Sequence, residues 1–84
     1  MNLRVLYFAR LREALGRGSE RLDLPADVNT VGALRAHLAG RGGEWAGALS
    51  GPAVRVAVNQ VMADAATVLA DGDEIAFFPP VTGG

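Results

Sequence analysis

The end of the sequence holds the group whose type and placement best suit chemistry. The last six residues follow directly on a predicted strand and read Pro79, Pro80, Val81, Thr82, Gly83 and Gly84. Two consecutive prolines stiffen the chain and prevent further strand pairing. The two glycines have no side chains, so a narrow channel can approach the terminal carboxylate closely. Six extended residues reach about 20 Å. The alternative is an ordinary frayed terminus, but this pattern predicts a flexible tail that threads its carboxylate into another protein's active site.

Other residues that could do chemistry have simpler interpretations. His37 has no metal-ligand partner nearby in the sequence, and metal sites need several ligands. The acidic run at 71–74 lacks the ligand spacing of a calcium loop and is typical of a turn. Ser19 and Ser50 have no histidine close by, so a catalytic triad is not indicated. We therefore expect no metal site, no bound cofactor and no catalysis by the chain alone.

The composition bounds the class of protein. The chain has 84 residues, half of them hydrophobic, which predicts one globular domain. The net charge of −1 gives no electrostatic case for nucleic acid or an anionic membrane as a partner. Cysteine is absent, which excludes disulfides, thiolate metal sites and a cysteine nucleophile. We see no signal peptide or membrane-spanning segment and expect a cytoplasmic protein. All eight basic residues are arginine, so the chain offers no lysine for an isopeptide bond.

The hydrophobic pattern predicts a small α+β fold. Strands are expected at residues 3–8, 20–24, 54–58, 61–62 and 74–78. Short helical stretches are expected at 9–15 and 44–49, and a main amphipathic helix follows the N-cap candidate Thr30. Strands on either side of one main helix favour a mixed sheet of about five strands with the helix packed on one face, as in a β-grasp fold. We expect a domain at 1–78 and a tail at 79–84.

Two of the predicted strands are apolar on both faces. If Tyr7 and Phe77 lie under the helix, alternation turns their neighbours to the opposite face. One long helix covers one face well, so the other is expected to keep an exposed apolar patch, and such patches often mark partner surfaces. The alternative, that loops cover the patch, is about equally favoured. The predicted interface residues are Leu6, Phe8, Met62 and Phe78.

These residues resemble a known family over nearly the whole chain. The matching stretches are residues 5–9 with Arg12 and Glu13, 30–35, 57–60, and 71–74 running into 77–84. The last is the most specific, because an acidic turn precedes a complete terminal octapeptide. The chain is similar to the MoaD-type small subunits of molybdopterin synthase, which are ubiquitin-like sulfur carriers of the β-grasp fold.

The resemblance implies a mechanism at the terminus. An E1-like adenylating enzyme (MoeB-type) would use ATP to convert the Gly84 carboxylate to an acyl-adenylate. Sulfur transfer would then give a C-terminal thiocarboxylate. Within molybdopterin synthase, beside the large subunit (MoaE-type), this group would donate sulfur to cyclic pyranopterin monophosphate (precursor Z). The tail residues 79–84 would insert into the partner, and the chain would bind no cofactor itself.

Two other functions stay open from the sequence. A related carrier could feed thiamin synthesis or another thiolation pathway with the same tail chemistry. A ubiquitin-like modifier could instead be conjugated to the lysines of other proteins. Capture of the large subunit, or isolation of covalent conjugates, would separate these functions.

Overall fold

A mixed sheet of five strands forms the body of the molecule, in the order β2-β1-β5-β3-β4. The computed structural model describes residues 1–51 and 53–79. The strands are β1 (Asn2–Tyr7), β2 (Ser19–Asp23), β3 (Arg55–Val58), β4 (Val61–Met62) and β5 (Glu74–Phe78). The helices are α1 (Arg10–Leu15), α2 (Val31–Ala39) and α3 (Glu44–Leu49). Strands β1 and β5 run parallel at the centre, and the other neighbours pair antiparallel.

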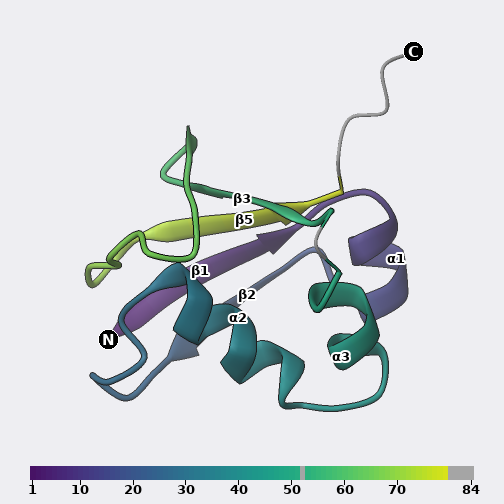
Figure 1. Ribbon diagram of the computed structural model, residues 1–84, viewed down its shortest axis with the longest axis horizontal. Coiled ribbons are helices and arrows are strands. Elements are labelled where there is room, and N and C mark those ends of the chain that lie inside the picture. Colours follow the sequence, from purple (N-terminus) through teal and green to yellow (C-terminus); the bar gives the residue numbers. More distant parts are fainter. Residues whose placement is uncertain (52, 80–84) are drawn as a thin grey trace.

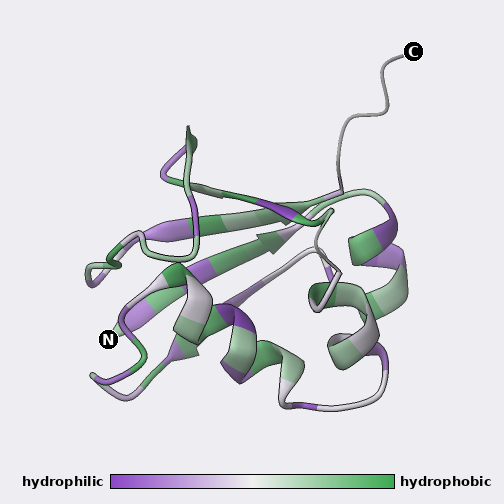
Figure 2. Cartoon of the chain, viewed as in Figure 1, coloured by the Kyte–Doolittle hydropathy of each residue, from purple (hydrophilic) through white to green (hydrophobic). Residues whose placement is uncertain are grey.

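The three helices lie on one side of this sheet (Figure 1). Hydrophobic and hydrophilic residues alternate over the first part of β1 (Figure 2), and its buried residues Leu3, Val5 and Tyr7 face the helices. The core joins residues of β1, β5 and α2 that are almost wholly inaccessible to solvent, among them Leu3, Val5, Tyr7, Leu34, Leu38, Ile75 and Phe77. Mixed pairing around one central parallel pair, with the longest helix packed across it, is the β-grasp fold, which confirms the predicted fold class. None of the helices in the described residues is long and apolar enough to span a membrane.

The main helix begins where the sequence predicts it. The Thr30 hydroxyl accepts a hydrogen bond from the Ala33 amide at 3.1 Å, which satisfies one of the free amides of the first turn. Val31, Leu34 and Leu38 are the buried residues of α2, and their spacing places them on one face of the helix. The predicted N-cap and apolar stripe are therefore confirmed.

The first helix begins one residue later than predicted. Ala9 has φ 53° and ψ −131°, a conformation that residues with a Cβ rarely adopt. Alanine is a strong helix former, so the sequence pattern includes it in the helix. The chain instead turns sharply at Ala9, and α1 starts at Arg10.

Gly32 lies inside α2, where glycine is unfavourable for the helix but allows another segment to pack closely against it. A Cβ built on Gly32 would lie 3.1 Å from the Ala65 carbonyl oxygen and 3.3 Å from the Ala65 Cβ. The Gly32 amide also donates to that carbonyl at 2.9 Å. The loop before β5 thus approaches the helix backbone closely. Gly47 in α3 differs, because a Cβ there would meet nothing within 4 Å.

These two glycines make a matched pair for a stability test. Gly47→Ala should raise the free energy of unfolding by up to about 1 kcal/mol, since alanine favours a helix interior and restricts the unfolded chain. Gly32→Ala should raise the free energy of unfolding by less than Gly47→Ala does, or should lower it, because the new methyl group crowds the Ala65 carbonyl. Urea denaturation of both variants measures this difference. Equal stabilisation by the two substitutions would contradict the close approach of the loop to α2.

Candidate functional site

The chain leaves the sheet from its central strand. Strand β5 lies between β1 and β3, and the ladder continues past β1, where the Phe8 amide donates to the Phe77 carbonyl at 3.1 Å. Pro79 follows Phe78 and is the last described residue. The other predicted tail residues, Pro80, Val81, Thr82, Gly83 and Gly84, lie outside the described residues, and the tail boundary and its role stay predictions.

An apolar strip crosses the sheet face turned away from the helices, here called the outer face. In register, Leu6 lies opposite Ala76, Ala76 opposite Ala57, and Ala57 opposite Met62. Residues directly opposite on neighbouring strands share a face. The apolar strip is completed beside the chain exit by Phe8 and Phe78, so that it consists of Leu6, Phe8, Ala57, Met62, Ala76 and Phe78.

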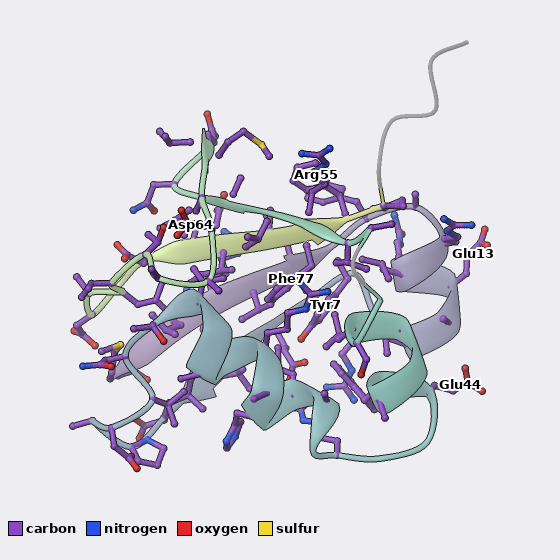
Figure 3. All side chains as sticks on the ribbon, in the orientation of Figure 1. Tyr7, Glu13, Glu44, Arg55, Asp64 and Phe77 are labelled. Atoms are coloured by element: carbon purple, nitrogen blue, oxygen red, sulfur yellow. The ribbon has the colours of Figure 1, made fainter. Side chains whose placement is uncertain are left out.

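The structure brings the four predicted interface residues onto this strip. Phe8 is 48 % exposed and Met62 57 % exposed, while Leu6 and Phe78 are half-buried. The described loops therefore leave Phe8 and Met62 open to solvent. The neighbouring aromatic rings point the other way: Tyr7 and Phe77 are buried on the helix side, with ring centroids 6.3 Å apart and planes 12° from parallel. Figure 3 shows these two rings between the sheet and the helices.

The turn at Ala9 borders the strip and went unnoticed in the sequence. Its backbone conformation is nearly that of Gly43, the N-cap of α3, which has φ 55° and ψ −131°. For alanine such a conformation costs on the order of 1–3 kcal/mol, and residues held in this way cluster at functional sites. Ala9 fixes the corner directly after Phe8. No periodicity or residue type in the sequence signals a positive φ at an alanine.

A hydrogen-bonded carboxylate supports the strip from the helix side. The Tyr7 hydroxyl donates to the Glu20 carboxylate at 2.8 Å, and the Arg41 guanidinium donates to both of its oxygens at 3.0 Å. Arg17 adds a third donor at 3.2 Å. The Arg41 guanidinium also lies 4.3 Å from the centre of the Trp45 ring. This network ties β1 and β2 to the chain segments around α3.

The network shifts the acidity of its members. Burial pushes the pKa of Glu20 upward, but hydrogen bonds from Arg41 and Tyr7 and the charges of Arg41 and Arg17 outweigh it, so the pKa of Glu20 lies below its ordinary value. Burial and then the hydrogen bond to Glu20 raise the pKa of the Tyr7 hydroxyl. Glu20 is thus ionised near neutral pH, and its oxygens accept hydrogen bonds from Tyr7, Arg17 and Arg41.

Among the remaining candidates from the sequence, Ser19 borders the strip, because it lies opposite Leu6 in register. His37 is exposed on α2, and Ser19 and Ser50 are exposed on β2 and after α3. Asp71 accepts a hydrogen bond from the Asn2 amide at 2.6 Å, and Asp73 accepts one from the Ala70 amide at 2.8 Å. The acidic run is therefore a turn, as predicted. Over residues 1–51 and 53–79, no three His, Asp or Glu side chains gather as a metal site would require.

The charge on the outer face is basic beside the chain exit. Arg55 lies opposite Phe78 in register, and its side chain points away from the helices (Figure 3). It is exposed and forms no ion pair with the described residues. The site is thus an apolar strip with an arginine at its edge, beside the point where the chain leaves the sheet. A surface with these apolar and basic side chains can bind a protein.

Comparisons with known proteins agree with this geometry. The model of a family described as "ThiS family" matches residues 5–84. The "Molybdopterin synthase sulfur carrier subunit" of Escherichia coli is 46% identical over 82 residues, covering 98% of this chain and 99% of that protein. Among solved structures, SAMP1 from Haloferax volcanii has a TM-score of 0.78 and 31% identity, with 100% of both chains covered. A "protein-protein complex of subunit 1 and 2 of Molybdopterin-converting factor" from Helicobacter pylori gives a TM-score of 0.72 and 27% identity, again over 100% of both chains.

The Glu20 network predicts a dependence of stability on pH. Because the folded pKa of Glu20 is depressed, its contribution is present above the unfolded pKa of about 4.3 and is lost as the pH falls through the folded pKa. Glu20→Gln should therefore lower the free energy of unfolding by about 1 kcal/mol at pH 7, and its deficit should shrink below pH 4. Urea denaturation at pH 7 and pH 3 measures both values.

Glu13→Gln is the matched control for this test. Glu13 is exposed on α1 (Figure 3) and forms no ion pair with the described residues. Its substitution should change the free energy of unfolding by at most a few tenths of a kcal/mol at either pH. A deficit for Glu20→Gln that is as large at pH 3 as at pH 7 would show that the charge of Glu20 does not stabilise the fold.

Proposed function

The chain belongs to the ThiS family, and we propose that it is the sulfur carrier subunit of a molybdopterin synthase, serving molybdenum cofactor biosynthesis. One observation carries the proposal: 46% identity with the E. coli sulfur carrier subunit over 98% of this chain. The position of the chain exit supports it. A carrier needs its reactive end to extend away from a folded body, and the central strand β5 ends at Phe78 with six residues still to follow.

The proposed chemistry takes place at the Gly84 carboxylate. A carboxylate is a poor acyl donor because it has no good leaving group. In the proposed first step a carboxylate oxygen attacks the α-phosphate of ATP in an adenylating enzyme, and pyrophosphate leaves. A sulfur nucleophile at the oxidation level of sulfide then attacks the acyl carbon and displaces AMP, which leaves a thiocarboxylate. The thiocarboxylate sulfur then bonds to a side-chain carbon of cyclic pyranopterin monophosphate and displaces an oxygen from that carbon. Water hydrolyses the resulting thioester, which restores the Gly84 carboxylate and leaves the sulfur on the pterin.

This chain supplies presentation and docking to that sequence of steps. Proline has no amide to donate to a neighbouring strand, so Pro79 and Pro80 cannot extend the sheet pairing, and the lack of side chains at Gly83 and Gly84 would let a narrow channel close around the reacting carbon. We assign the apolar strip to the contact with the large subunit, with Leu6, Phe8, Met62 and Phe78 as its main residues. A partner of this kind is supported by the H. pylori complex of subunits 1 and 2. The chain is then the small, sulfur-donating subunit, and the ATP used by its adenylating partner suits a cytoplasmic location.

A second candidate function is supported by one observation. SAMP1 from H. volcanii shares the fold of this chain at a TM-score of 0.78. Another solved protein structure from H. volcanii is described as "small archaeal modifier protein 1". A modifier would form isopeptide bonds between its terminus and the lysines of other proteins. A third candidate function, which would use the same tail chemistry, is that of a sulfur carrier for thiamin synthesis or another thiolation pathway. Affinity capture from the native host separates them, since a carrier retains the large subunit without covalent conjugates.

The tail should control activity without affecting folding. Deletion of Gly84, or addition of one residue after it, is expected to abolish sulfur transfer in a reconstituted synthase, because displacement of the reacting carbon by about 1 Å can cost on the order of a hundredfold in rate. Gly83→Ala should impair adenylation or transfer, because its Cβ must enter the channel. Melting temperatures of all three variants should match the unaltered protein. Full activity of the extended variant would contradict a role for the terminus.

The strip should matter for binding more than for stability. Phe8→Arg is expected to weaken binding to the large subunit by about thirtyfold, the equivalent of 2 kcal/mol for a buried interface aromatic. Phe78→Arg should act in the same direction. Because Phe8 is already 48 % exposed, the charge stays in water and the domain stays folded. Calorimetric titration and circular-dichroism melting measure the two effects on the same sample.

Val68→Arg is the control for this substitution. Val68 is 71 % exposed but lies outside the strip, where it bridges to Thr30. This substitution makes the same change from an apolar to a basic side chain, and it should leave the affinity for the large subunit within twofold of that of the unaltered protein. If Phe8→Arg unfolds the protein, or if it binds as tightly as Val68→Arg, the strip is not the docking surface.

A further inference from the structure

Two arginines face each other on the outer face, beyond the apolar strip. In register, Arg4 of β1 lies directly opposite Arg21 of β2. Side chains in such a pair have Cβ atoms about 5 Å apart, and like charges placed there are destabilising. Both residues are exposed. The folded chain therefore holds two positive charges side by side, with Glu74 opposite Arg4 on the other neighbouring strand.

Neither arginine is well neutralised by the described residues. Arg4 lies directly opposite Glu74 of β5 in register, but the two charged groups approach only to 4.0 Å, and the Arg4 side chain is 57 % exposed. Arg21 takes part in no ion pair within residues 1–51 and 53–79. Asp23 is also on β2, and its carboxylate contacts the N-terminal ammonium at 3.5 Å. The two guanidinium groups thus keep donors that the chain itself does not use.

A hollow of about 220 Å³ lies between these two arginines. Its lining is made by Asn2, Leu3, Arg4, Arg21 and Gly72. Arginine donates through a planar fork that matches the two oxygens of a carboxylate. The hollow therefore offers two such forks to one acidic side chain, which would also remove the repulsion between the arginines.

The hollow is continuous with the proposed docking surface. Arg4 and Leu6 lie on the same face of β1, and Phe8 follows directly after the strand. The hollow therefore lies about 13 Å from the chain exit at 3.3 Å per residue. A protein interface of ordinary size, with about 800 Å² on each partner, spans that distance. A partner seated on the apolar strip therefore extends over the arginine pair as well.

We propose that the hollow between Arg4 and Arg21 receives an aspartate or glutamate side chain of the large subunit that docks on the apolar strip. The inference rests on the proposed function, which supplies that partner. The ion pair fixes the rotation of the carrier on its partner at a second point, away from the tail. Its partner chemistry is that of a protein carboxylate, and a free phosphate or nucleotide is the competing occupant.

The test measures affinity and stability on the same variants. Arg21→Gln should weaken binding to the large subunit about tenfold at 50 mM NaCl, and the loss should be smaller at 500 mM, because salt screens the ion pair. The same change should raise the melting temperature of the free carrier by about 2 °C, since it removes a like-charge pair. Arg4→Gln should weaken binding similarly, and the double variant should lose less than the product of the two effects.

Ala36→Glu is the matched control. It shifts the net charge by the same −1 on the exposed side of α2, and it should leave the affinity within twofold. If the unaltered carrier fails to bind the large subunit, the proposed function fails. If the unaltered carrier binds but Arg21→Gln binds equally well, or no more weakly than Ala36→Glu, the inference alone is overturned. Saturable binding of inorganic phosphate or ATP to the free carrier that Arg21→Gln abolishes would overturn it in favour of a small-anion site.

Discussion

The parallel pairing of β1 with β5 is the contact on which the rest of the structure depends. It joins the two ends of the described chain, in a register that runs from Arg4 with Glu74 to Tyr7 with Phe77. Such a long-range pairing closes almost the whole chain into one loop, and its entropy cost is repaid only by the core that it creates. That core includes the near-parallel Tyr7 and Phe77 rings. Because β5 lies inside the sheet, the described chain ends at one end of a central strand, with Phe8 and Phe78 beside the exit.

The two faces of this pair serve different purposes. On the helix side, apolar residues pack to near-zero exposure, and the Tyr7 hydroxyl reaches a carboxylate that Arg41 and Arg17 hold in place. This side stabilises the domain. On the outer face, the chain leaves Phe8 and Met62 open, holds Ala9 in a costly conformation and sets Arg4 against Arg21. Each of these features costs stability in the free protein, and a partner that covers the outer face would recover that cost. A small carrier that docks on a partner protein has a physical reason to keep such a surface.

The sequence predicts most of the fold, because the fold depends largely on local pattern. Period-two alternation locates the strands, and the Thr30 cap with its apolar stripe locates α2. Alternation also separates Tyr7 and Phe77 from the residues of the outer face. The sequence does not reveal features that depend on tertiary pairing. The opposition of Arg4 and Arg21 follows from strand register, the Glu20 network from the approach of Arg41 across 21 residues, and the role of Gly32 from a loop more than 30 residues away. Ala9 is missed because alanine is a helix former by every local measure. The tail chemistry rests on the terminal residues and on the family alone.

The central claim is that the terminus of this chain carries sulfur. It is tested most directly by intact-mass analysis of the protein purified from its native host without added reductant. The account predicts a fraction of molecules in which one terminal oxygen is replaced by sulfur, and fragmentation that places this change on Gly84. That fraction should disappear when the chain is incubated with the large subunit and cyclic pyranopterin monophosphate. A terminus found only as the carboxylate, or found joined to lysines of other proteins, would contradict the account.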